Sequence, residues 1–104
     1  MTRKSKEFMK FDEGKPQLAY LPTREVEQIM KVLDYGANKY ERDNWKKPHD
    51  TNRTLSSLLR HVFAFMRGEF TDEESGHSHL AHAGCCIIML MWHTNERNKN
   101  VKTR

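Results

Sequence analysis

The sequence predicts an all-α fold, a small helical bundle of three main helices that follows an extended N-terminal arm. Apolar residues recur at helical spacing in three stretches, each bounded by residues that start or stop helices, and no stretch alternates as a strand does. At 104 residues, 37% of them hydrophobic, the chain forms one domain with a modest core. We therefore expect a single domain over 1–104, ordered over about 10–95, whose burial is completed by homo-oligomerisation.

The first part of the chain is predicted as an arm followed by a helix and a loop. Pro16 and Pro22 punctuate a segment with no sustained periodicity, which is typical of an extended or turning arm. Thr23 is the expected N-cap of a first helix, because apolar residues recur at helical spacing from there to Tyr40. The segment 41–52 is dense in charged and turn-forming residues and is predicted as a loop.

The second half is predicted to hold the other two helices. The second begins at Thr54 and ends at the Arg67-Gly68 pair, a common helix stop. The third begins at the capping residues 72–75 and ends near His93. Because it is apolar nearly all round from Ala83 to Trp92, we expect it to be the most buried element.

The excess positive charge lies at the two ends of the chain. Residues 1–10 and 96–104 each carry a net charge of +3, whereas residues 11–95 carry −2. The basic tails, 1–9 and 96–104, have little to bury and are expected to be frayed or disordered. Such tails favour solubility and loose contacts with anions, so we expect no specific nucleic-acid partner.

Cysteine use and the apolar runs favour a soluble cytoplasmic protein. The adjacent Cys85 and Cys86 are poorly placed for an intrachain disulfide and suit the core of a protein in a reducing compartment. The N-terminus has no apolar stretch of the secretory type. The run from Ala83 to Trp92 is about half the roughly 18–20 residues that a membrane span needs. We expect no membrane association.

The stretch "GEFTDEESGHSHLAHA", residues 68–83, is the strongest candidate for chemistry. His79 and His82 lie one helical turn apart, on a stripe that continues through Cys86. Two interpretations stay open at this point: the histidines face one ion or phosphate, or they hydrogen-bond to neighbours at a subunit contact. Glu73 and His77 are expected to face solvent as bystanders, and spacing does not show whether Cys86 belongs to a site.

Three carboxylates, those of Glu69, Asp72 and Glu74, crowd the loop before these histidines. Unpaired carboxylates repel one another unless a cation intervenes, so they are candidate ligands for Mg²⁺ or Mn²⁺. A solvated acidic capping loop accounts for the same spacing equally well. Zn²⁺ suits this oxygen-rich set less well than a harder ion.

Four residues elsewhere are candidate nucleotide contacts, each with a structural alternative. Arg60 and His61 interrupt an apolar stretch, and Arg60 either clamps a phosphate or pairs with the acidic loop. Lys39 is a cation near the end of the first helix, or an ordinary surface side chain. Asn44 and Trp45 are suited to contacting and stacking on a base, although Trp45 taken alone is better explained as core filler.

Several motifs together resemble a family of phage-associated proteins, the dATP/dGTP diphosphohydrolase N-terminal domain. The resemblance spans about residues 10–92 and rests on "DEGKPQLAYLP", "YGANKYERDNW" and "LLRHVFAFMRGEFTDEESGHSHLAHA". It adds Lys15, from a Gly-Lys pair, and His61, from an Arg-His pair, to the candidate substrate-binding residues. MazG-like pyrophosphatases, which the family resembles in style, show two acidic pairs; Glu69 and Asp72 match only the second.

The resemblance implies a metal-dependent pyrophosphohydrolase that converts purine (deoxy)nucleoside triphosphates to monophosphate and pyrophosphate, in the host cytoplasm if the protein is phage-encoded. Glu69, Asp72 and Glu74 would hold Mg²⁺ or Mn²⁺, and His79 or His82 would orient or deprotonate the attacking water. The alternative is an oligomeric protein that binds a nucleotide or nucleotide signal without hydrolysing it. A third interpretation is a purely structural helical adaptor, which does not explain why the loop is so acidic.

Overall fold

The described part of the chain, residues 7–102, forms three α-helices and two short 3₁₀ turns. The helices are α1 (Thr23–Lys39), α2 (Thr51–Met66) and α3 (His79–Lys102), and the turns are η2 (Leu18–Tyr20) and η3 (Asn44–Lys46). Within the described range, the computed structural model has no strand ladder. The all-α fold predicted from helical periodicity is confirmed.

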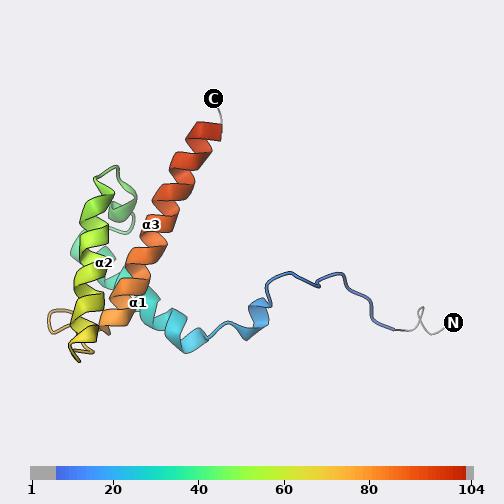
Figure 1. Cartoon of the computed structure of the whole chain (residues 1–104), viewed down its shortest axis with the longest axis horizontal. Coiled ribbons are helices and arrows are strands. Elements are labelled where there is room, and N and C mark those ends of the chain that lie inside the picture. The colour runs from blue at the N-terminus through green and yellow to red at the C-terminus, as the bar shows by residue number, and fades with distance from the viewer. Residues whose placement is uncertain (1–6, 103–104) are drawn as a thin grey trace.

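The bundle is built around α3, which packs against both α2 and α1 and also touches η3. α2 and α3 lie side by side and run in opposite directions, joined by a loop at one end of the pair (Figure 1). The core is made of small residues: Val32, Ala81 and Cys85 form its buried centre. Small side chains allow close approach of the helices but leave the core thin, as the composition predicted.

Both ends of α2 are set by local chemistry. The helix begins at Thr51, earlier than the predicted Thr54, because Asp50 acts as the N-cap and its Oδ1 accepts a hydrogen bond from Asn52 N–H at 3.0 Å. It ends at Met66 as predicted, since Gly68 follows with φ +89°, a conformation that glycine adopts without strain.

The predicted start of α3 at residues 72–75 is wrong, because those residues form a turn and the helix begins at His79. Gly76, with φ +75°, interrupts any helix that would start earlier. The capping role falls to Ser78, whose Oγ accepts hydrogen bonds from the backbone N–H groups of Leu80 and Ala81 at 3.1 and 3.2 Å.

The other end of α3 extends well beyond the predicted His93, to Lys102, so residues 96–102 continue the helix where a frayed tail was expected. The helix holds most of the buried apolar residues, but its apolar run is not covered on every side. Ile87, Ile88 and Met91 are 48%, 48% and 59% exposed. Within the described residues no helix is long and apolar enough to cross a membrane.

The arm formed by residues 7–22 runs away from the helices, as Figure 1 shows. Leu18 and Tyr20 are 76% and 83% exposed, so the apolar side chains of this arm do not add to the core of the single chain. That homo-oligomerisation completes the burial stays a prediction.

Candidate functional site

The loop between α2 and α3 is fixed by backbone hydrogen bonds that hold Asp72 opposite the start of α3. Asp72 N–H donates to the His77 carbonyl at 2.8 Å, and His79 N–H donates to the Phe70 carbonyl, also at 2.8 Å. Thr71 and Ser78 form an isolated antiparallel bridge between the two sides of the loop. The loop is therefore a hydrogen-bonded, hairpin-like connection in which Asp72 and Ser75 are half-buried and Glu69, Glu73 and Glu74 are exposed.

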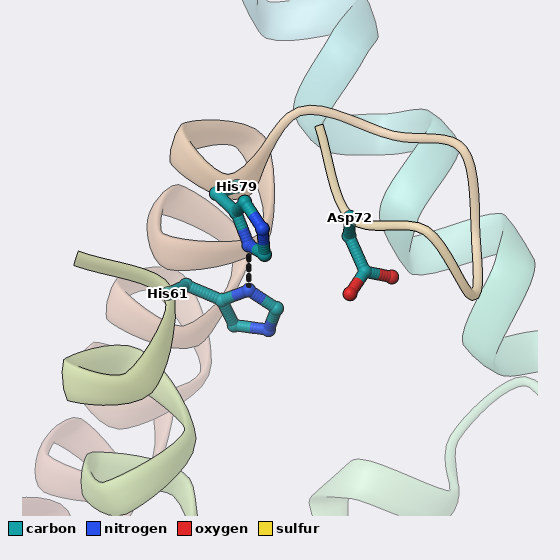
Figure 2. A group of neighbouring side chains, drawn as sticks. All are labelled: His61, Asp72 and His79. Carbon is teal, nitrogen blue, oxygen red and sulfur yellow. Dashed lines mark hydrogen bonds between the residues drawn. The ribbon is translucent and has the colours of Figure 1, made fainter. Parts of the chain in front are cut away.

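Three side chains from three different elements converge at this end of the bundle. They are His61 of α2, Asp72 of the loop and His79, the first residue of α3, and one ligand atom from each lies within 4.8 Å of the others. Figure 2 shows the two imidazole rings meeting edge to edge with the Asp72 carboxylate turned toward them. The Nδ1 atoms of His61 and His79 are 2.8 Å apart. These three side chains, called here the His/Asp/His group, are a candidate metal site.

His82 adjoins the group one turn further along α3. Its ring stacks on His61 with centroids 4.4 Å apart and planes only 8° from parallel. Its Nε2 lies 2.7 Å from Ser75 Oγ, whose own hydroxyl donates to Asp72 Oδ2 at 2.7 Å. Because a hydroxyl has only one proton, Ser75 accepts from His82 Nε2–H, and the neutral His82 ring keeps its Nδ1 as an acceptor.

Burial keeps two of these rings neutral and hydrogen bonding keeps the carboxylate ionised. Burial, reinforced by the repulsion that protonated His82 and His79 would exert, lowers the pKa of His61 to about 4. Burial also lowers the pKa of His82, although Asp72 opposes this effect. Burial alone would raise the pKa of Asp72, but the side-chain and backbone hydrogen bonds from Ser75 outweigh it and the pKa is lowered. A neutral imidazole and an ionised carboxylate are the forms that bind metals.

Two of the three predicted metal-ligand carboxylates are held by basic side chains instead. Glu69 accepts a hydrogen bond from Arg67 Nε at 2.8 Å, and Glu74 accepts from Lys39 Nζ at 2.9 Å. Neither belongs to the His/Asp/His group that the described residues form. Nearby Arg67 and Lys39 thus pair with two of the crowded carboxylates, and the assignment of Glu69 and Glu74 as metal ligands stays a prediction.

A cleft of about 620 Å³ lies between the C-terminal half of α1, η3, α2 and α3. Its lining combines apolar residues with four basic and three aromatic side chains, and it holds a single carboxylate, that of Glu41. The basic side chains are those of Lys39, Lys47, Arg53 and Arg60. His82 belongs both to this lining and to the surroundings of the His/Asp/His group, so the cleft and the group adjoin.

Four of the six predicted substrate-binding residues line this cleft: Lys39, Asn44, Trp45 and Arg60. Trp45 packs edge-on against Trp92, with ring centroids 5.4 Å apart, and so both fills space and faces the cleft. His61 lies in the His/Asp/His group instead. Lys15 lies in the exposed arm and is not among the lining residues.

The two predicted bystanders behave differently. Glu73 is exposed, as expected. His77 was expected to face solvent but is half-buried, because its ring packs edge-on against Tyr35 with centroids 6.0 Å apart. Tyr35 also lines the cleft, and its hydroxyl donates to Glu74 Oε1 at 3.3 Å. The loop is thus tied to α1 through Tyr35.

Several cleft residues escaped the sequence interpretation. Arg53 and Ser57 precede Arg60 by seven and three positions, which places all three on one face of α2. This spacing along α2 could have identified Arg53 and Ser57 from the sequence. Cys86 continues the His79–His82 stripe and also lines the cleft, so the stripe follows the cleft wall rather than ending at the histidines.

The fold and site together define a small all-α domain in which a basic cleft adjoins a His/Asp/His group. The chain belongs to the family described as dATP/dGTP diphosphohydrolase, N-terminal, whose match covers residues 5–104. It is 35% identical over 89 residues to a protein of Salmonella phage PMBT28 named dATP/dGTP diphosphohydrolase. That match covers 86% of this chain but only 30% of the phage protein, so the chain spans less than a third of that relative. No solved structure matches the chain.

Proposed function

We propose that the cleft binds a purine deoxynucleoside triphosphate and that the adjoining His/Asp/His group acts on its phosphates. In this proposal the domain releases a monophosphate and pyrophosphate with the help of a divalent metal ion. The observation that carries the proposal is the continuity between a cleft lined by four basic side chains and the His/Asp/His group, through the shared residue His82. The family description and the name of the phage relative support nucleotides as the substrate class.

The charges of the cleft suit a polyanionic ligand. Lys39 and Lys47 pair with Glu74 and Glu41, but Arg53 and Arg60 form no ion pair within the described part of the chain. A guanidinium without a carboxylate partner is available for bidentate hydrogen bonds to phosphate. The cleft volume of about 620 Å³ falls within the range of pockets that enclose small molecules.

The part of the cleft lined by Tyr40, Asn44 and Trp45 suits a nucleobase. Tyr40 and Trp45 supply aromatic surface there, and Asn44 supplies an amide that both donates and accepts hydrogen bonds. The purine preference comes from the family description and not from the geometry of these side chains. We assign the base to this end and the phosphates to the end at Arg60 and His82.

The chain's own residues supply the proton transfer in the proposed reaction. His82 presents its free Nδ1 to a water molecule, while Ser75 and Asp72 hold the opposite ring nitrogen. Arg60 compensates charge that develops on the phosphate oxygens as the attacking bond forms. A divalent ion, when bound, supplies further charge compensation and polarises the phosphoryl group.

A second candidate function is nucleotide binding without hydrolysis. It is favoured by the pairing of Glu69 and Glu74 with basic side chains, which leaves Asp72 as the one carboxylate of the His/Asp/His group. Hydrolases that bind two metal ions generally need more carboxylates than this to hold the ions and offset their charge. A binding domain needs only the cleft and its arginines.

The deciding experiment is an incubation of the purified protein with dATP, dGTP, dCTP and dTTP, with and without Mg²⁺ or Mn²⁺. We expect metal-dependent release of monophosphate and pyrophosphate from the purine nucleotides, at least about 100-fold slower in Asp72→Asn. Asp34→Asn is the matched control, because Asp34 is exposed and pairs with Arg42 away from the cleft. Tight binding of purine nucleotides with no turnover in either metal would reject hydrolysis and favour the binding function.

A further inference from the structure

The contact between His61 and His79 has an unusual chemistry. Their Nδ1 atoms face each other at 2.8 Å, so one ring donates to the other and the two rings share a single proton. When the donor ring carries this proton on its Nε2 instead, both rings stay neutral and their two Nδ1 lone pairs are aimed at one point. A cation that accepts nitrogen ligands is suited to take the place of the proton.

A carboxylate completes the set and is held in place before any ion arrives. Asp72 offers an oxygen within 4.8 Å of both imidazole ligand atoms. Its Oδ2 accepts two hydrogen bonds from Ser75, from the backbone N–H at 2.9 Å and from the hydroxyl at 2.7 Å. His79 is 91% buried, with its backbone N–H bonded to Phe70. Ligands fixed by such outer contacts bind metals more tightly than free ones.

We propose that His61, Asp72 and His79 bind one first-row transition-metal ion, such as Zn²⁺, Co²⁺ or Mn²⁺, in preference to Mg²⁺. Two imidazole nitrogens and one carboxylate suit these borderline ions, whereas Mg²⁺ prefers a shell made of oxygen. A tetrahedral ion with metal–nitrogen bonds of about 2.0–2.1 Å separates its ligand atoms by about 3.3 Å. The two rings therefore need to part by only about half an ångström from the 2.8 Å contact.

Three protein ligands leave at least one coordination position for a water or a phosphate oxygen. The ligand set also replaces the predicted trio of Glu69, Asp72 and Glu74, of which only Asp72 joins the group. The inference depends on the geometry of three side chains and holds whether or not the cleft hydrolyses a nucleotide.

The test is direct metal binding in the absence of nucleotide. Tag-free protein is stripped with EDTA, dialysed and titrated with Co²⁺, whose visible absorption reports its ligands. We expect one Co²⁺ per chain, displaced by stoichiometric Zn²⁺ and unaffected by a large excess of Mg²⁺. Absence of a Co²⁺ spectrum, or displacement by Mg²⁺ as readily as by Zn²⁺, would overturn the proposal.

Variants assign the binding to the three residues. His61→Gln and Asp72→Asn should each raise the Co²⁺ dissociation constant by about 100-fold or more, because loss of a ligand costs more than loss of an outer contact. His93→Gln and Asp34→Asn are matched controls, since His93 contacts the Trp45 carbonyl and Asp34 pairs with Arg42. Wild-type affinity in both His61→Gln and Asp72→Asn would place the ion elsewhere. Circular dichroism checks that each variant is folded, and the stoichiometry and Mg²⁺ competition of the wild type test the proposal independently of them.

Discussion

Ser75→Ala removes a hydroxyl that connects three parts of the site. Ser75 Oγ donates to Asp72 Oδ2 at 2.7 Å and lies 2.7 Å from His82 Nε2. It also accepts from the backbone N–H of His77 at 3.2 Å. Alanine keeps the backbone N–H that bonds to Asp72, so the substitution removes only these three side-chain hydrogen bonds.

The size of the effect follows from the kinds of bond that are lost. A hydrogen bond to a charged group contributes about 1.5–3 kcal/mol and a neutral one about 0.5–1.5 kcal/mol. The Asp72 and His82 side chains are 22% and 13% exposed, so water replaces part of what is lost. We therefore expect the free energy of unfolding to fall by about 2 kcal/mol. For a domain of this size the Tm falls by about 10 °C.

Thermal and urea unfolding followed by circular dichroism measure this loss in metal-free protein. Ser56→Ala is the matched control, because Ser56 is exposed on α2 and makes no side-chain hydrogen bond within the described residues. It should leave the Tm within about 2 °C of the wild-type value. If Ser75→Ala is as stable as Ser56→Ala, the link from Asp72 through Ser75 to His82 does not hold the loop.

Two further predictions concern stability. In metal-free protein the lowered pKa of His61, about 4 against an ordinary 6.5, means that between these values the unfolded chain binds more protons than the folded one. The free energy of unfolding should therefore fall by about 1–2 kcal/mol as the pH drops from 6.5 to 4, a value reduced to allow for the partial exposure of His61. Urea unfolding at the two pH values should show a smaller fall for His61→Gln. Urea unfolding should show that Gly84→Ala is less stable than Gly36→Ala by about 1–3 kcal/mol. A Cβ at Gly84 would lie 2.7 Å from Ile29 Cδ1, whereas a Cβ at Gly36 meets no atom within 4 Å. Equal stability of the two alanine variants would contradict the tight packing of α1 on α3.

The helices were predictable because the spacing of apolar residues depends only on local sequence. The start of α3 was not, since Asp72 and Ser75 are good capping residues both in a helix and in a turn. Gly76 and Ser78 decide between the two: Gly76 takes a positive φ and Ser78 caps the helix. The C-terminal end of α3 was predicted too early, because the polar residues after His93 have adequate helix propensity. A prediction based on burial does not take that propensity into account.

The candidate site was predictable in part for a similar reason. His79 and His82 share a helix face, so their proximity follows from spacing. The pairing of Glu74 with Lys39 joins residues 35 positions apart and is invisible in the local sequence. His61 was noticed as a polar interruption of an apolar stretch, but its contact with His79 was not predictable, because that contact depends on how α2 packs on α3. Long-range packing therefore decides which of the polar residues form the group.

We propose that the basic cleft and the His/Asp/His group form one nucleotide site. Calorimetric titration of a non-hydrolysable α,β-methylene analogue of dGTP, with Mn²⁺ present, tests it most directly. Arg60→Gln perturbs the cleft and His61→Gln the group, whereas Arg24→Gln, which breaks only an exposed pair with Glu25, is the control. Both site variants should bind the analogue at least about tenfold more weakly than the wild type and the control, which is the loss expected from one charge-assisted contact. Binding that is unchanged in either site variant would contradict it.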